Sequence, residues 1–347
     1  MTTTPLGEIA VFEAGLTEVA GGVWAWIQPN GGLGESNAGL VAGDGESLLV
    51  DTLWDERLTR RMLDVIEPIA AERAAPITRL FNTHGDGDHW YGNGLLETSV
   101  EIVATEAAGE QMREEPPAIL TRLAPVGSVA GLAGRVPMLP GAASLRGLAN
   151  FRSMLSNYEF GGINPRTPSR TFIGLETLEV GGRIVELIEV GPAHTTGDAI
   201  AWLPDAKVVF AGDILFNGVT PIMWAGPVDN WIAACERIEA LEPVAVVGGH
   251  GPVGGVAEVR LIREHWSWLA GEIAAAADED LGDLSERLIR SEAWRTSPWA
   301  EWRNPERTMV NVARIRATSA GGASEIGTPE RLKLIAGMGA LAERLRD

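Results

Sequence analysis

The sequence predicts a protein of mixed α/β class, and two observations carry this prediction. Short apolar runs bounded by turn-forming residues recur over residues 23–105 and again over residues 184–249, a pattern typical of buried strands. Longer segments with apolar residues at helical spacing lie between and after these runs. The chain has 347 residues, 45% of them hydrophobic, so it is long enough to bury a large core.

In chain order, the predicted strands of the first stretch are "VWAWI", "AGLVAG", "SLLVDT", "ITRLF" and "EIVAT". A helix over residues 56–74 interrupts them, because one helical face collects Leu58, Met62, Leu63, Ile66 and Ile69. The second stretch predicts the strands "IVELIEV", "AIAWL", "KVVFAG" and "VAVVGG", with a helix over residues 229–241 between the last two. Strands and helices therefore mix in both halves of the chain.

Residues 105–170 read as an insertion, because they are rich in Pro, Gly, Leu and Ala and poor in charge. Such a segment could be a lid over an apolar substrate, an interface of a homodimer, or ordinary packing against the C-terminal helices. After residue 254 the spacing predicts helices over 256–277, 283–291, 305–317 and 329–344. We therefore divide the chain into a unit of residues 1–254, which contains the largely helical insertion, and a helical extension of residues 255–347 packed on it.

Composition excludes several classes of partner. The net charge of −19 and the isoelectric point near 4.7 repel nucleic-acid phosphates and anionic lipid. The first residues resemble no signal peptide, and no run reaches about 18 apolar residues, so we expect a cytoplasmic protein without membrane or nucleic-acid partners. The single cysteine, Cys235, shares helical spacing with apolar neighbours, which predicts a packed thiol and excludes a disulfide within one chain.

A cluster of imidazoles and carboxylates follows the predicted strand "ITRLF". The stretch "NTHGDGDHWYGN" places His84, Asp86, Asp88 and His89 within six positions, with glycines that allow a tight loop. Further predicted strands are followed by His194, Asp213 and His250. Four of the five histidines thus lie at strand ends beside glycines. Imidazole and carboxylate are ligands for divalent metals, so the pattern predicts a metal site.

These residues resemble the metallo-β-lactamase superfamily, whose HxHxDH loop appears here as "HGDGDH", followed in the family's order by a later His, an Asp and a final His. The resemblance covers residues 23–252 and implies an αββα sandwich with ligands on loops at one edge. It implies that Asp213 bridges two metal sites and that Asp51 is a buried acid that orients the ligand loop. The resemblance assigns His84, Asp86 and His194 to the first site, Asp88, His89 and His250 to the second, and weaker supporting roles to Thr195, Thr196 and Asp198.

The resemblance also implies a function. We expect two divalent ions, with zinc as the first choice, and a bridging hydroxide that attacks an ester, lactone, thioester or amide-type bond. We assign catalytic roles to Asp88, Asp213 and Asp51. The substrate is expected to be a small, fairly apolar or neutral molecule, because the sequence shows no arginine cluster for phosphate or sulfate. Trp90, Trp224 and Phe216 are predicted to line its pocket, whereas His265 is expected to be a surface or packing residue.

Asp86 departs from the family pattern, in which most members have histidine. A carboxylate makes iron or manganese more plausible beside zinc. The flavodiiron proteins of the same superfamily carry glutamate at this position and reduce oxygen or nitric oxide, which gives the alternative of a dinuclear iron oxidoreductase. Asp86 could also fail to bind metal, in which case only the second site would be firmly occupied by a metal ion. A protein that only binds a ligand is disfavoured, because no other position departs from the pattern.

Overall fold

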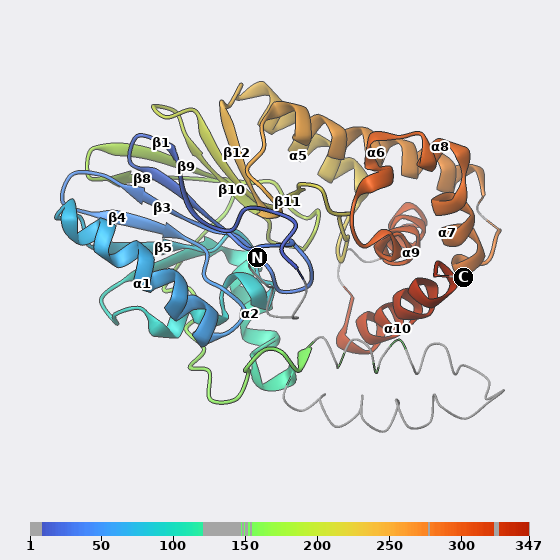
Figure 1. Ribbon diagram of the computed structural model, residues 1–347, viewed down its shortest axis with the longest axis horizontal. Coiled ribbons are helices and arrows are strands. Elements are labelled where there is room, and N and C mark those ends of the chain that lie inside the picture. The colour runs from blue at the N-terminus through green and yellow to red at the C-terminus, as the bar shows by residue number, and fades with distance from the viewer. Residues whose placement is uncertain are drawn as a thin grey trace.

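The protein forms two stacked β-sheets flanked by helices, with a helical unit at one side. The structure is a computed structural model and describes residues 9–120, 155–276, 278–322 and 326–346, together with Gly147, Ala149 and Arg152. Figure 1 shows the sheets on the left and the C-terminal helices on the right. The middle of the predicted insertion lies outside the described residues, and so do most of the residues on which its roles as lid or dimer interface were predicted.

The first sheet has seven strands in the order β1 to β7. The early strands pair antiparallel, and pairing becomes parallel between β4 and β5, where α1 makes the crossover. α1 begins at Asp55, whose side chain accepts a hydrogen bond from Leu58 N. The bounds are β1 (Gly15–Ala20), β2 (Val23–Ile27), β3 (Ala38–Ala42), β4 (Ser47–Val50), α1 (Glu56–Glu72), β5 (Ile77–Phe81), β6 (Glu101–Thr105), α2 (Glu106–Glu114) and β7 (Arg170–Phe172).

The second sheet has five strands in the order β12-β11-β10-β9-β8. β11 and β12 are parallel and are joined through α5, whereas the other neighbours are antiparallel. Its elements are β8 (Leu175–Val180), β9 (Arg183–Glu189), β10 (Ala199–Leu203), β11 (Val208–Phe216), α5 (Val228–Ala240) and β12 (Ala245–His250). The predicted strands are all present, while β1, β7 and β8 were not predicted, because their many exposed and polar positions give no apolar run.

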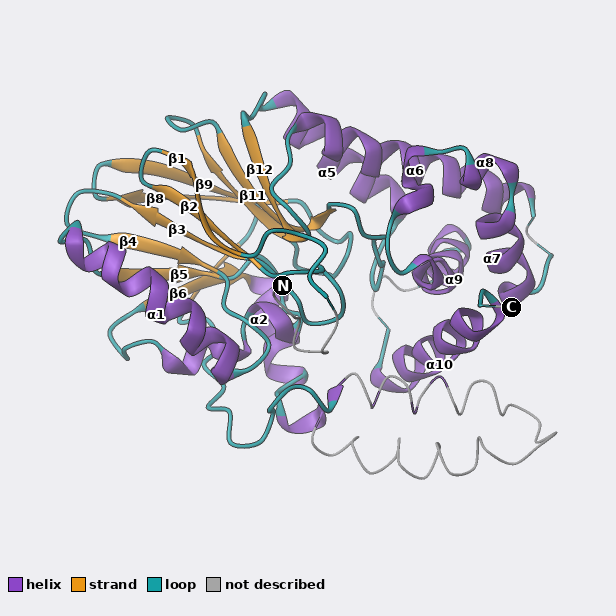
Figure 2. Cartoon of the chain, in the orientation of Figure 1, coloured by secondary structure: helices purple, strands orange, loops and turns teal. Residues whose placement is uncertain are grey.

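Three apolar layers hold the sandwich together. One lies between the sheets and includes Val41, Leu187 and Phe210. A second packs α1 on the first sheet, and a third packs α5 and α6 (Val256–Ala275) on the second sheet around Trp231 and Trp266. Figure 2 shows the same arrangement, with helices outside both sheets. The predicted αββα sandwich is confirmed, and Cys235 is a buried thiol in the third layer, as predicted.

The C-terminal extension is helical, as predicted. The helix expected over 305–317 is divided into a 3₁₀ turn, Pro305–Arg307, and α9, because Asn304 before it has a left-handed backbone (φ 57°) and Pro305 begins the turn. No helix in the described part of the chain is long and apolar enough to cross a bilayer. The remaining elements are α7 (Leu281–Arg290), α8 (Glu292–Arg295), a 3₁₀ turn (Pro298–Glu301), α9 (Thr308–Ser319) and α10 (Thr328–Arg344).

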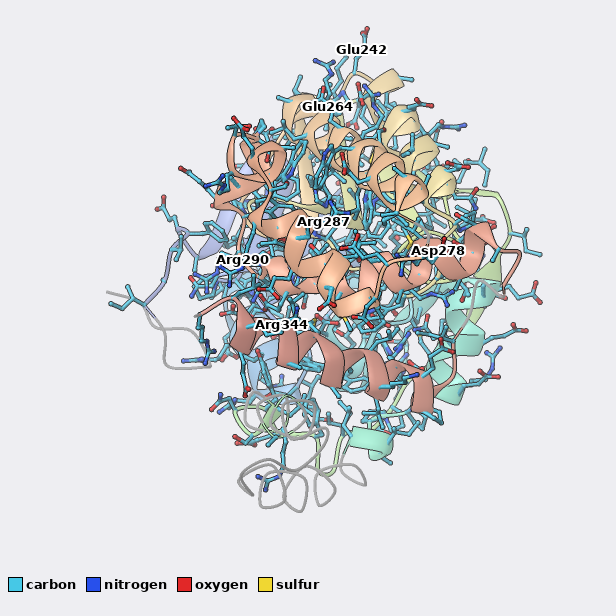
Figure 3. The ribbon with its side chains drawn as sticks, turned by 90° about the vertical axis from the view of Figure 1, so that its right-hand side faces the viewer. Glu242, Glu264, Asp278, Arg287, Arg290 and Arg344 are labelled. Carbon is cyan, nitrogen blue, oxygen red and sulfur yellow. The ribbon has the colours of Figure 1, made fainter. Side chains whose placement is uncertain are left out.

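Ion pairs join α10 to α7 on the outer face of the extension. Arg344 Nη2 lies 2.8 Å from Asp283 Oδ1 and also pairs with Glu286, and Figure 3 shows Arg287, Arg290 and Arg344 along this face. Exposed pairs of this kind contribute at most about 1 kcal/mol each. The apolar contacts beneath them, such as Leu341 with its tryptophan-rich cluster, therefore contribute more to the docking of α10.

His265 is buried in that extension, as a packing residue rather than a surface one. It is 0% exposed, and within the described residues neither ring nitrogen has a hydrogen-bond partner. Burial lowers its pKa to about 3, because an imidazolium would lose its hydration there. The surrounding rings belong to Trp266, Trp268, Trp294, Trp299 and Trp302.

This histidine should make the fold sensitive to acid. Between pH 6.5 and 3 the unfolded chain binds a proton at His265 and the folded chain does not, so stability falls as the pH decreases. From pH 7 to 4.5 we expect the metal-free wild type to lose about 2 kcal/mol more unfolding free energy than His265→Leu. Urea unfolding of both proteins at the two pH values measures this difference. Equal losses of unfolding free energy in the two proteins would show that protonation of His265 does not cause the acid sensitivity.

Candidate metal centre

The predicted ligands meet at one edge of the two sheets. The loop after β5 carries His84 to His89, His194 lies between β9 and β10, and His250 ends β12. Asp213 lies inside β11 rather than after it, because β11 continues to Phe216. The pairing of β11 with β12 is irregular around Gly212, whose φ of 49° is left-handed.

Close backbone packing sets the position of Asp213. A methyl group on Gly249 would come within 1.8 Å of Asp213 Oδ1, and one on Gly212 would come within 2.7 Å of Thr83 Cβ. Glycine at both positions therefore lets β11, β12 and the loop after β5 approach one another. This approach explains why glycines accompany the histidines and aspartates in the sequence.

Two groups of donors surround Asp213. His84, His194 and Asp213 offer ligand atoms within 4.8 Å of one another, and so do Asp88, His89 and His250. Asp213 Oδ2 lies 3.2 Å from His194 Nε2 and 3.4 Å from His250 Nε2, and its Oδ1 lies 3.2 Å from His89 Nε2. Asp213 thus faces members of both groups.

Asp86 adjoins the first group through one oxygen only. Its Oδ2 lies 3.2 Å from His194 Nε2. Its Oδ1 accepts a hydrogen bond of 2.8 Å from Gln111 Nε2 and lies 3.5 Å from Arg331 Nη1. Gln111 in α2 and Arg331 in α10 were not predicted, and no local pattern marks either of them.

The arrangement of nitrogen and oxygen atoms fits divalent metal ions. The Nε2 atoms of His84, His89 and His194 and Oδ1 of Asp213 are buried and have no hydrogen-bond partner among the described residues. Buried polar atoms are normally paired, and these atoms face one another across distances that a cation would fill. The donor set of imidazole nitrogens and carboxylate oxygens suits zinc, iron and manganese alike.

Hydrogen bonds to the Nδ1 atoms orient two of the imidazole rings. Asp51 Oδ2 lies 2.9 Å from His89 Nδ1, and its two oxygens also accept hydrogen bonds of 2.8 Å from Thr83 N and Oγ1. His194 Nδ1 lies 2.7 Å from the carbonyl oxygen of Ile222. With the Nδ1 atoms held in this way, the Nε2 atoms point to the centre of the site.

Asp198 organises the loop that carries His194. Its carboxylate accepts hydrogen bonds from Ala193 N and Thr195 N, and one of 2.6 Å from Thr195 Oγ1. Burial raises the pKa of Asp198 to about 6, against the opposing effects of His194 and Thr195. Thr196 is half-buried and does not line the cavity. The supporting role expected for Asp198 and Thr195 is therefore one of fixing the backbone.

Protons and cations would compete at the same atoms. Burial opposes protonation of His194, but Asp213 and Asp86 favour it more strongly and raise its pKa to about 9. Burial likewise favours the neutral acid at Asp213, yet His250, His89 and His194 hold its pKa well below the usual range. A metal ion would have to displace the proton from His194, so metal affinity should decrease as the pH falls.

A cavity of about 600 Å³ opens over this centre. Asp86, Asp88, His194, Asp213 and His250 line its floor. Apolar side chains form the walls, and one wall belongs to α10, whose first turns lie toward α2 in Figure 1. The wall residues are Leu33, Trp54, Tyr91, Ile119 and Leu120 on one side and Leu332, Ile335 and Met338 of α10 on the other.

One of the three aromatic residues predicted to line this cavity does not line it. Trp90 does not line it: the side chain is 0% exposed and donates a hydrogen bond to Gly85 O. Phe216 and Trp224 do line it. The sequence shows no arginine cluster, and the fold brings three separate arginines of the C-terminal extension to the cavity, namely Arg307, Arg331 and Arg346.

The fold and this centre define the class of protein as an αββα sandwich with His/Asp groups that could hold metal ions. A family model described as the metallo-beta-lactamase superfamily matches residues 31–250, and the chain belongs to that superfamily. The match ends at His250, before the helical extension.

Solved structures agree with the fold. A metallo-beta-lactamase from Pontibacter korlensis is 18% identical over 74% of this chain and 99% of its own, with a TM-score of 0.53. A metallo-beta-lactamase family protein from Thermus thermophilus is 19% identical over 86% and 94%, with a TM-score of 0.58. A double mutant of the sec-alkyl sulfatase PisA1 is 16% identical over 92% and 52%, with a TM-score of 0.62. At these identities the likeness shows the fold alone.

Proposed function

We propose that the protein is a dinuclear metal-dependent hydrolase. The observation that carries this proposal is the position of Asp213, whose carboxylate faces two groups of mostly buried donors. Several of their imidazole nitrogens have no hydrogen-bond partner in the described part of the chain. His84, Asp86 and His194 would hold the first ion, and Asp213 would be shared with the second. The second ion would be held by Asp88, His89 and His250.

The chain's own residues prepare this site for hydrolysis. Two bound divalent ions would supply a water that ionises near neutral pH and a Lewis acid for the substrate carbonyl. Asp51 fixes the ring of His89, and Ile222 O fixes the ring of His194. Apolar side chains make up much of the lining around the reacting groups. No serine or cysteine nucleophile is required.

The cavity supports a small substrate with a largely apolar body. A volume of about 600 Å³ is that of a typical small-molecule site. Aliphatic and aromatic side chains make up much of the lining, the candidate metal ligands lie at the floor, and charged side chains such as Glu306 and Arg307 also line the cavity. We therefore propose an ester, lactone, thioester or amide-type bond held at the floor, with the rest of the molecule between the walls.

A dinuclear iron oxidoreductase is the second candidate, and Asp86 is the observation that favours it. Asp86 offers an oxygen beside His194 where an imidazole would offer nitrogen, and Gln111 holds its other oxygen in place. A carboxylate in the first site shifts preference toward harder metals. The identity of the bound metal, zinc or iron, would thus distinguish the two candidate functions.

Elemental analysis of protein purified without added metal tests both functions. Close to two zinc ions per chain, together with hydrolysis in an ester, lactone and lactam screen, would support the hydrolase. Substantial iron with visible absorption and oxygen uptake in the presence of a reductant would support the oxidoreductase. Protein that binds no zinc, iron or manganese, even when each is added, would contradict both.

A further inference from the structure

One buried arginine in the cavity has no carboxylate partner. Arg307 ends the 3₁₀ turn before α9 and is 7% exposed. Within the described residues its side chain makes one hydrogen bond, from Nη1 to Thr220 O at 3.0 Å, and no carboxylate lies within ion-pair distance. The other arginine near the floor differs, because Arg331 pairs with Glu115 at 2.9 Å.

The guanidinium of Arg307 lies beside the metal centre. Its central carbon is 5.5 Å from the centroid of the Phe216 ring, and that ring stacks on His250 with centroids 5.0 Å apart. Arg307, Phe216 and His250 all line the cavity. A ligand whose reacting bond lies over Asp213 could therefore extend a second group to Arg307.

A buried guanidinium without a directly paired anion is costly, because it gives up hydration, and Glu306, Asp213 and Asp88 offset this cost only from beyond ion-pair distance. The planar fork of Arg307 has five donors, which match the paired oxygens of a carboxylate. We propose that Arg307 binds a carboxylate of the substrate, so that the substrate is a small molecule with an apolar body and one acidic group. Binding of a carboxylate by Arg307 does not depend on the proposed function. Only the statement that this ligand is a substrate rests on it.

Binding of a simple acid tests the proposal separately from catalysis. Isothermal titration of the metal-loaded protein with hexanoate and with its neutral counterpart hexanamide compares the two ligands. We expect tighter binding of hexanoate, and a loss of about 10- to 100-fold in Arg307→Gln with hexanamide binding unchanged. Arg307→Lys, which keeps the charge, should lose less.

A matched control is available in the same extension. Arg314 is also buried and donates a hydrogen bond to Ala225 O, but it does not line the cavity. Arg314→Gln should leave the hexanoate preference intact. Equal binding of both ligands by the wild type, or hexanoate binding that persists in R307Q because a metal holds the carboxylate, would overturn the proposal. A protein that binds hexanoate through Arg307 but hydrolyses no ester, lactone, thioester or amide-type substrate would contradict the proposed function and keep this inference.

Discussion

Replacing Asp213 by alanine is expected to release metal and reduce hydrolysis on the order of a thousandfold or more. Asp213 is 5% exposed and lies within 3.4 Å of Nε2 of His89, His194 and His250. Its loss would remove the carboxylate that faces both donor groups. Metal content by elemental analysis and kcat/KM for the best substrate of the screen measure the two effects.

The control for this substitution is Asp229→Ala, which removes an exposed aspartate of α5 that does not line the cavity. That variant should keep its metal and its activity. Thermal unfolding of both variants without metal tests whether the fold survives. Retention of two tightly bound ions in D213A would show that the assignment of the shared ligand is wrong.

Asp51→Asn is expected to weaken metal binding by about 10- to 100-fold, chiefly at the site that contains His89. Asp51 does not face the cavity; its carboxylate bonds His89 Nδ1 and Thr83. Asparagine keeps the size of the side chain and tolerates the left-handed backbone (φ 59°) at this position. The amide nitrogen, however, cannot accept a hydrogen bond and carries no charge.

Competition with a chelator measures the affinity of each ion in Asp51→Asn and in the wild type. We expect one ion to be released at lower chelator concentration, while the other changes little. Identical chelator curves would mean that Asp51 only terminates a strand. A similar melting temperature of the two metal-free proteins would separate the metal effect from a loss of fold.

The ligands could be predicted from the sequence because each is marked locally. His84, Asp86, Asp88 and His89 follow an apolar strand within one loop, and strand ends on one edge of a sheet converge by geometry. The helices of the extension were also predictable, because their apolar spacing is regular. Local patterns of this kind need no knowledge of the partners that the fold supplies.

The surroundings of the ligands could not be predicted, because they depend on contacts between distant segments. Gln111 and Arg331 meet at Asp86 from α2 and α10. Arg307 reaches the cavity only because the extension folds back over the second sheet. Trp90 follows the ligand loop in sequence, yet its ring packs into the core, and sequence proximity to a site does not fix the direction of a side chain.

The cavity wall formed by α10 has a consequence for how relatives of this protein diverge. The residues that could hold metal lie within 31–250, the part matched by the superfamily model, whereas Leu332, Ile335 and Met338 lie outside it. Substitutions in the extension can therefore change which molecules fit without touching the chemistry at the floor. Proteins that share the "HGDGDH" loop but differ after residue 254 should be sorted by their extensions when substrates are assigned.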